Sequence, residues 1–237
     1  MKNTLAIARK EFKSYLTSPM AYVVTGVFLA LTGIFFGTSP ATYYNTSISG
    51  IWSFWGQLIL MAIAALLTMR LIAEERKIGT LELLLTAPVR DSEIIIGKFL
   101  GSLCILCVML LLTLYYPLML ILFGDPDIGP LVTAYIGLFL LGSASLAIGL
   151  FASSVTSNQI VSVVIAGAIL FALWFIGLAT SYLPEAIAEV INYFSLAYYF
   201  PDFITGIVDT RGIVFYLSIT ALFLFLAIRS LENSRWN

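Results

Sequence analysis

The sequence predicts an all-α integral membrane protein with six transmembrane helices. Three observations indicate this fold class: 60% of the 237 residues are hydrophobic, only 11% are charged, and six apolar stretches are long enough to cross a bilayer. An average globular protein has about 25% charged residues, and a soluble domain of this size needs polar groups to cover its surface. Because lipid offers no partner to free backbone groups, the apolar stretches are expected to be helices.

The six spans are expected at residues 20–38, 51–69, 99–123, 131–151, 160–180 and 213–229. Each is close to the roughly 20 apolar residues that a helix needs to cross the hydrocarbon core. Before its end residues, none of these stretches contains Asp, Glu, Lys or Arg. Residues 1–237 therefore read as one transmembrane domain.

The basic residues predict the orientation of the spans. In a six-span arrangement 11 of the 12 basic residues lie on one side, and only Arg211 lies on the other. The positive-inside rule then places both termini in the cytoplasm. The expected location of the protein is the inner (cytoplasmic) membrane of the cell. The apolar run that begins at Met20 is longer than the core of a usual signal peptide, so we expect it to be retained as the first span.

An amphipathic helix is expected over residues 1–17, before the first span. Its apolar stripe recurs at three- and four-residue steps, and Ser18-Pro19 ends it; the stripe consists of Leu5, Ala8, Phe12, Tyr15 and Leu16. Basic residues on the other faces suit a helix that lies at the cytoplasmic membrane surface. Such a helix could be a simple anchor or could take part in coupling to a partner, and the sequence leaves both readings open.

The longest cytoplasmic loop, residues 70–98, combines charge with leucines. A charged cluster at 74–77 is followed by Gly79 as a helix breaker and by Thr80 as the N-cap of a short leucine-rich helix that ends at Pro88. Asp91 or Ser92 is expected to cap a second helix that runs through Glu93 and Lys98 into the third span. Apolar residues with a charged rim favour a docking surface, and the alternative is an interfacial helix packed on lipid.

Outside the membrane, residues 181–212 predict a helical hairpin that enters the outer leaflet without crossing it. Pro184 suits the first helical position, N1, with Glu185 beside it. A second short helical piece is expected from Phe200 to Val208, and aromatic residues surround it. Aromatic residues at this density are typical of the membrane interface.

Several kinds of catalytic and ligand-binding site are excluded by residues and motifs that the sequence lacks. There is no histidine, and the Cys104-x-x-Cys107 pair lies inside an apolar span, where two packed cysteines are a better reading than a metal or redox site. The spans carry no ionisable residue of the kind that ion-coupled transporters use, and Gly97-Lys98 lacks the rest of a phosphate-binding loop. We therefore expect neither enzymatic activity nor a cofactor in this chain, and a net charge of −1 gives no reason to expect nucleic acid as a partner.

Small residues at four-residue steps indicate close helix packing. Ser145, Gly149 and Ser153 form one such row, and Gly33 with Gly37 forms another. These rows could lie inside the bundle or on a face that pairs with a second subunit. We expect a dimer in which Ser145 and Gly149 contribute to helix contacts.

Three segments resemble permeases of the type-two exporter family of ABC transporters. They are Glu75–Val89 (ERKIGTLELLLTAPV), the opening run Arg9–Tyr15 (RKEFKSY) with Ser18-Pro19 and Ala21-Tyr22, and the late stretch from Phe203 to Arg211 that continues through Val214 to Tyr216. Together they are similar to the permeases associated with gliding motility and with copper-enzyme maturation. The resemblance extends over the whole chain.

The resemblance implies the transmembrane permease subunit of an exporter. It implies a coupling helix at about residues 75–89, a second permease subunit of the same or a different kind, and two separate ATPase subunits that hold ATP and Mg²⁺. The alternative is a non-pumping channel or the anchoring subunit of a larger membrane assembly. The residues that the resemblance assigns to ATPase coupling are Glu75, Arg76, Gly79, Thr80, Glu82, Leu83, Leu84 and Pro88, and those of the external hairpin are Pro184, Glu185, Gly206, Asp209 and Arg211.

Overall fold

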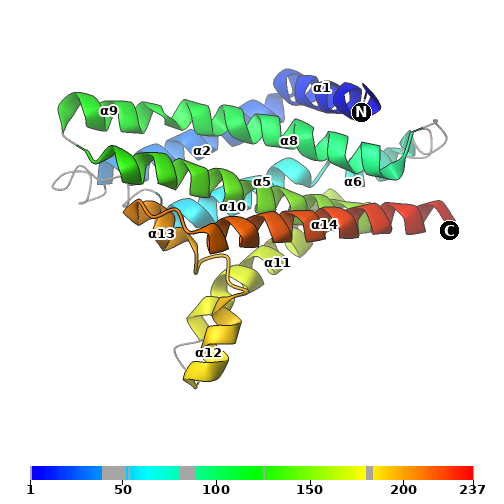
Figure 1. The fold of residues 1–237 in the computed structure, drawn as a ribbon. Coiled ribbons are helices and arrows are strands. Elements are labelled where there is room, and N and C mark those ends of the chain that lie inside the picture. The colour runs from blue at the N-terminus through cyan, green and yellow to red at the C-terminus, as the bar shows by residue number, and fades with distance from the viewer. Residues whose placement is uncertain are drawn as a thin grey trace.

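The structure is a computed structural model that describes residues 2–38, 52, 54–80, 89–124, 126–179 and 184–236. Six helical segments in this part of the chain are long and apolar enough to cross a membrane, which confirms the number and order of the expected spans. Several extend beyond the expected edges because their helices continue into polar sequence. The helices (Figure 1) are α1 (Lys2–Thr17), α2 (Pro19–Thr38), α5 (Phe54–Thr68), α6 (Ala73–Ile78), α8 (Asp91–Thr113), α9 (Tyr115–Phe123), α10 (Ile128–Val155), α11 (Gln159–Ala179), α12 (Glu185–Asn192), α13 (Phe200–Thr205) and α14 (Thr210–Trp236).

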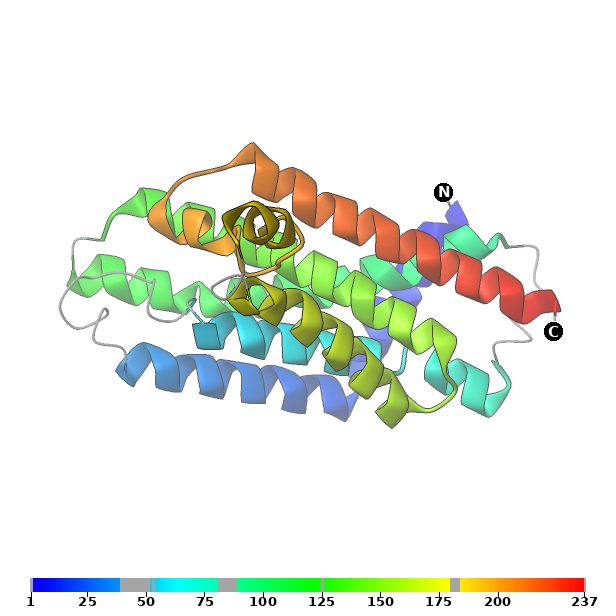
Figure 2. The same ribbon diagram turned by 90° about the horizontal axis from the view of Figure 1, so that it is seen from below.

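Helix α10 is the centre of the bundle. It packs against α5, α8, α11, α13 and α14, and every residue from 140 to 150 is buried. In Figure 2 it lies between α14 on one side and α5 on the other. Its small residues allow close approach: a Cβ at Gly142 would lie 2.6 Å from a methyl group of Leu106, and one at Gly149 would overlap the hydroxyl of Thr68.

This packing corrects one expectation about assembly. Ser145 is fully buried, and Gly149 lies against Thr68 of α5, so both belong to the interior of the bundle. They are not part of a surface that could pair with a second subunit. The physical reason is that a row of small residues lets any helix approach, and α5 of the same chain already occupies this row.

The two chain ends lie at the same end of the bundle as α6, whereas α9 and α13 lie at the opposite end (Figure 1). Arg211, at the start of α14, is at the α13 end. Arg70 lies just before α6, Arg76 lies on α6, and Arg229 is near the end of α14. The distribution of charge along the bundle is thus the one expected for six spans.

A proline interrupts the third span between α8 and α9. Pro117 has no backbone N–H, so the carbonyl of Thr113 loses its helical partner. The hydroxyl of Tyr135 on α10 donates a hydrogen bond to that carbonyl at 2.9 Å. The α8–α9 break is therefore stabilised by a side chain from the central helix.

Candidate functional site

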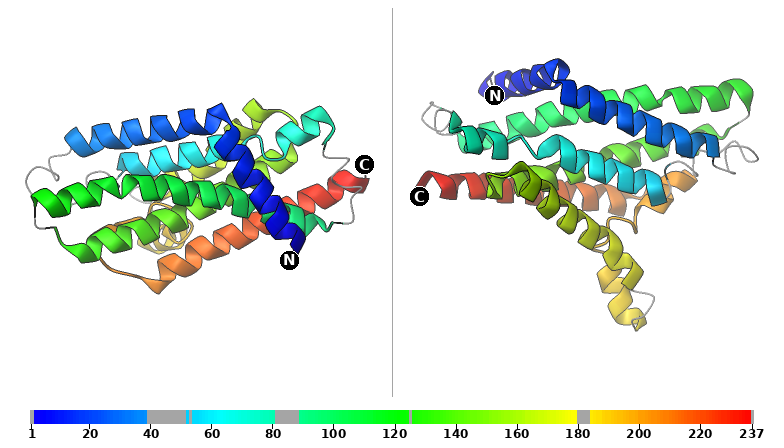
Figure 3. Two further views of the ribbon diagram at one scale, coloured as in Figure 1. Left: turned by 90° about the horizontal axis from the view of Figure 1, so that it is seen from above. Right: turned by 180° about the vertical axis from the view of Figure 1, so that it is seen from behind.

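Helix α1 crosses directly over the beginning of α8 (Figure 3, left). Two glycines of α8 make this contact close, because a Cβ at Gly97 would lie 2.8 Å from Ile7 and a Cβ at Gly101 would lie 2.6 Å from the Cβ of Glu11. The buried face of α1 is therefore centred on Ile7, Ala8 and Glu11. Of the expected apolar stripe, Ala8 and Tyr15 are buried, whereas Leu5 and Leu16 are 70% and 43% exposed.

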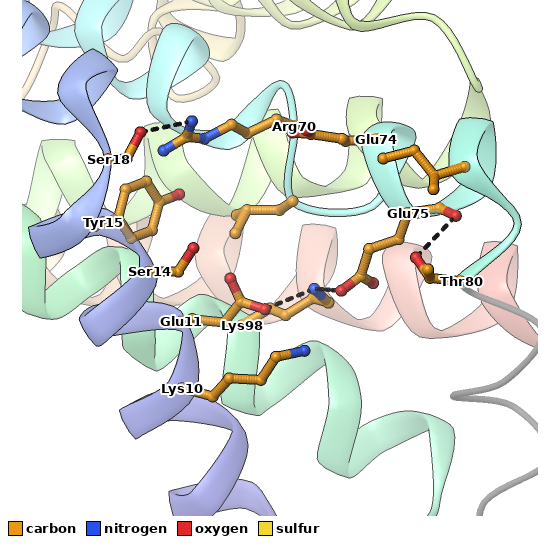
Figure 4. A pocket seen from close by; sticks show the side chains of 12 residues that line it. Lys10, Glu11, Ser14, Tyr15, Ser18, Arg70, Glu74, Glu75, Thr80 and Lys98 are labelled. Carbon is orange, nitrogen blue, oxygen red and sulfur yellow. Dashed lines mark hydrogen bonds and ion pairs between the residues drawn. The ribbon is translucent and has the colours of Figure 1, made fainter.

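A buried lysine joins three helices at this crossing (Figure 4). Lys98 of α8 is 1% exposed, and its Nζ lies 2.9 Å from Glu11 Oε1 of α1 and 2.8 Å from Glu75 Oε1 of α6. Glu11 and Glu75 are 13% and 20% exposed, so both carboxylates are largely removed from water. One ammonium group between two carboxylates leaves this triad, Lys98–Glu11–Glu75, with a formal charge of −1.

A second contact ties α1 to the end of α5. Tyr15 donates a hydrogen bond from its hydroxyl to the carbonyl oxygen of Leu67 at 2.7 Å. The guanidinium of Arg70 lies over the Tyr15 ring at 5.3 Å and donates to Ser18 Oγ at 3.0 Å. Burial raises the pKa of Tyr15 far above its ordinary value; the charge of Glu11 adds to the rise and that of Arg70 opposes it. The phenol therefore remains a hydrogen-bond donor at every physiological pH.

These contacts surround a cavity of about 270 Å³ between α1, α6 and α8. Its wall carries both signs of charge, and Figure 4 shows side chains of α1 on one side and of α6 on the other. The balance of three basic and three acidic residues selects neither an anion nor a cation as a ligand. The lining residues are Lys10, Glu11, Ser14, Tyr15, Ser18, Arg70, Leu71, Glu74, Glu75, Ile78, Thr80 and Lys98.

Of the residues assigned to coupling, the structure describes the first four. Glu75 and Arg76 lie on α6, which ends as expected at Gly79, where φ is +80° and the left-handed backbone favours glycine. The hydroxyl of Thr80 donates to the carbonyl of Glu75 at 3.3 Å. Among the described residues, Glu75 Oε2 and Arg76 Nε are buried without a hydrogen-bond partner. Glu82, Leu83, Leu84 and Pro88 lie outside the described residues.

The start of α8 corrects the expected cap. Arg90, with extended backbone angles, is the N-cap, and Asp91 is already the first helical residue. The reason is the carboxylate of Glu93, which accepts the backbone N–H of Arg90 at 3.2 Å and so takes over a role that we expected from Asp91 or Ser92. The helix then runs without a break from Asp91 through Lys98, as the sequence indicated.

On the opposite end of the bundle, the two short helices of the expected hairpin are present as α12 and α13. Pro184 has an extended ψ of 144° and is the N-cap of α12, so Glu185 is the first helical residue and the N1 assignment of Pro184 was wrong. Helix α13 ends at Gly206, where φ is +93°. Asp209 accepts the backbone N–H of Arg211 at 2.9 Å and so begins α14, and the Arg211 side chain is exposed.

Helix α12 stands away from the bundle at the end of α11 (Figure 3, right). The exposed fractions of Ile187 and Val190, and of Phe194 just after the helix, are 51%, 58% and 58%, so the described chain covers the expected apolar face of α12 only in part. Helix α13 is held more firmly, because Thr133 of α10 donates to the carbonyl of Phe203 at 2.6 Å. The two parts of the hairpin thus differ in their attachment to the bundle.

The residue at the centre of the site could not be recognised from the sequence. The sequence places Lys98 in the helix that leads into the third span, in an incomplete phosphate-binding motif, and Glu11 in the run that resembles the exporter permeases, and nothing in it indicates that the two meet. The usable signal was a lysine beside Gly97 at the edge of an apolar run, with Gly101 one turn later, since two glycines on one face invite a crossing helix. That signal does not say which helix crosses.

A family model described as ABC-2 family transporter protein matches residues 5–234 of the chain. The match includes α6, α8, the hairpin and all but the first three residues of α1. No curated protein matches the chain.

Proposed function

The chain belongs to the ABC-2 family of transporter proteins, and from this premise we propose that it is the permease subunit of an ABC exporter that is driven by a separate ATPase. The observation that carries the proposal is the triad Lys98–Glu11–Glu75, because it joins three helices at the start of the proposed coupling segment, about residues 75–89. A force on this segment would reach α5 through α6 and reach α1 and α8 through Lys98. ATP and Mg²⁺ would bind to the ATPase, and the chain would need no cofactor.

The contact with the ATPase is proposed to be mainly hydrophobic. Each leucine that is fully buried on docking stabilises the complex by roughly 1.5–3 kcal/mol, whereas an exposed ion pair contributes about 0–1 kcal/mol. Leu83 and Leu84 are therefore expected to supply most of the affinity. Glu82, Arg76 and the neighbouring charges would set the orientation at the rim, and Pro88 would end the coupling helix.

The orientation follows from the distribution of charge. The end of the bundle that holds α6 and both termini is proposed to face the cytoplasm, since most basic residues belong to segments at that end. Helices α12 and α13 would then lie at the outer surface, with Pro184, Glu185, Gly206, Asp209 and Arg211 shaping their ends. The inner membrane is the proposed location.

The complete exporter is proposed to contain two permease subunits and two ATPase subunits. Since Ser145 and Gly149 lie inside the bundle, the second permease has to pair through other surfaces. The relation to gliding-motility and copper-enzyme-maturation permeases rests on the sequence resemblance and is likewise a proposal.

Co-purification tests the proposal. The full-length permease is expressed with candidate ATPases, starting with any that carries Walker motifs and whose gene adjoins its own, and it is expected to retain its ATPase on affinity purification. The double variant Leu83→Asp plus Leu84→Asp should lose it while still inserting into the membrane. Ile207→Asp is the matched control, since Ile207 is an exposed apolar residue at the opposite end of the bundle. Retention of the ATPase by the double variant at wild-type level would refute the coupling segment, and failure of the wild type to bind any ATPase would refute the permease function.

A further inference from the structure

The second span breaks where α5 ends and α6 begins. Residues 69–72 form a turn between the two helices, and Ile72, the residue before α6, has a φ of −122°, outside the helical range. In an unbroken helix the N–H of Ala73 would donate to the carbonyl of Met69, four residues earlier. A break at this point needs another partner for each of these groups.

One side chain from another helix supplies those partners. The hydroxyl of Ser153, on α10, accepts the backbone N–H groups of Ile72 at 3.1 Å and of Ala73 at 3.0 Å. The same hydroxyl donates to the carbonyl of Met69 at 3.1 Å. It thus stands between the two groups that would have bonded to each other. Insertion of a side chain into the helical ladder is a recognised cause of a sharp bend.

The environment makes this hydroxyl difficult to replace. Ser153, Ile72 and Ala73 are all fully buried, so water cannot easily satisfy the backbone groups if the hydroxyl is removed. The other serines in the buried part of α10 behave differently. Ser145 and Ser143 donate back to carbonyls of their own helix, at Leu141 and Leu140.

The contact also extends beyond α10. The next residue, Ser154, offers its carbonyl to the hydroxyl of Ser230 on α14 at 3.1 Å. Two consecutive residues of the central helix are therefore bonded to the α5–α6 break on one side and to the last span on the other. A movement of α6 has a hydrogen-bonded route to α10 and α14 that does not pass through the triad.

We infer that Ser153 is a positioning residue for coupling: its hydroxyl fixes the bend between α5 and α6, and so fixes the direction in which α6 leads into the coupling segment. This inference rests on the proposed function for its consequence, because a bend that is held rigidly transmits force from a docked ATPase to the central helix. Without the hydroxyl, the span would straighten or its end would fray. Either change moves the start of the coupling segment relative to α10.

Hydrogen exchange of the full-length permease in lipid nanodiscs tests the bend itself. Ser153→Ala removes one oxygen atom and adds no bulk, and it leaves two buried donors without an acceptor. Exchange of the amides at 69–79 should become roughly tenfold faster, since local opening becomes easier when buried donors lose their partner. Ser145→Ala is the matched control, because it removes the same atom from a buried position on the same helix. Equal protection of 69–79 in both variants would overturn the inference.

The rate of ATP hydrolysis by the ATPase bound to the permease in proteoliposomes, divided by the rate of the free ATPase, tests the coupling without a transported substrate. Ser153→Ala should lower this ratio several-fold while the ATPase stays bound, and Ser153→Thr, which keeps the hydroxyl, should restore most of it. A wild-type ratio in Ser153→Ala would overturn the role in coupling. If the wild type binds no ATPase, the proposed function fails, and the exchange experiment still decides whether Ser153 holds the bend.

Discussion

Replacing Lys98 by methionine removes the positive charge that holds the triad together and keeps a side chain of similar length. At distances of 2.9 and 2.8 Å, each charge pair is worth roughly 6 kcal/mol of gross attraction at an effective dielectric constant of about 20. Most of that attraction is offset by the cost of taking the three groups out of water. Removing one partner of a buried pair usually costs about 3–5 kcal/mol, because the remaining charge stays uncompensated.

The lower end of that range applies here, since Glu11 and Glu75 keep some contact with solvent. We expect the free energy of unfolding of Lys98→Met to fall by about 3 kcal/mol. For a protein of this size, that corresponds to a thermal midpoint lower by roughly 6–12 °C. The loss should appear in thermal unfolding of the detergent-solubilised permease, followed by tryptophan fluorescence.

Two further variants make the test specific. Lys10→Met changes the same charge at the edge of the same cavity, but Lys10 is exposed and makes no ion pair with the described residues, so its midpoint should stay near that of the wild type. The triple variant Lys98→Met, Glu11→Gln, Glu75→Gln removes both uncompensated charges and should recover part of the loss. The electrostatic account of the triad would be refuted if Lys98→Met had the thermal midpoint of the wild type. It would also be refuted if the triple variant had a midpoint no higher than that of Lys98→Met.

Three other predictions follow from the packing and the topology. Gly149→Ala should lower the free energy of unfolding by about 1–3 kcal/mol, because its methyl group would overlap Thr68. Gly167→Ala is the control and should be tolerated, since a Cβ at Gly167 has open space. Thermal unfolding of both variants gives the comparison. Tyr135→Phe removes the donor at the proline break and should cost about 0.5–1.5 kcal/mol in the same assay; a wild-type midpoint would show that the carbonyl of Thr113 finds another partner. Single cysteines introduced on a background without the two native cysteines should be labelled only from the cytoplasm at positions 3, 80 and 234, and only from outside at positions 45 and 209. Labelling of position 80 from outside would contradict the orientation.

The spans could be predicted because the bilayer imposes their length and composition on the sequence. A run such as 160–180 without any charge has few alternatives to a membrane helix, and Gly79 ends α6 as expected. Helix α13, expected to continue to Val208, instead ends before Gly206, whose positive φ stops it. Helix ends were predicted less accurately. Arg90 could not be recognised as an N-cap because its own side chain does not cap the helix; the carboxylate that does so belongs to Glu93, three residues later.

The site was predictable only in part, because its central contacts join residues that are distant in sequence. Glu11 and Lys98 are 87 residues apart, and nothing in the periodicity of α1 indicates which helix it will cross. For the same reason the spacing of the α1 stripe did not indicate the contact with α8, which a pair of glycines forms with Ile7 and Glu11. Leu5 and Leu16 stay exposed, and whether they face lipid, as the amphipathic pattern predicts, stays a prediction. A serine such as Ser153 carries no sequence signal that separates it from Ser145.

The crossing of α1 over α8 also means that α1 is synthesised well before the helix that it packs against. Helix α1 is made first, but its partner lysine is added 87 residues later, which at a ribosomal rate of about 5–20 residues per second is a delay of roughly 4–17 s. Throughout that interval Glu11 lacks Lys98, and the face of α1 around Ile7 lacks the glycines of α8 that it packs against in the finished bundle. The exposed side chains of Leu5 and Leu16 are suited to hold the new helix at the lipid surface until Lys98 emerges. We therefore expect two leucines that contribute little to the finished bundle to serve as a temporary anchor for the nascent chain.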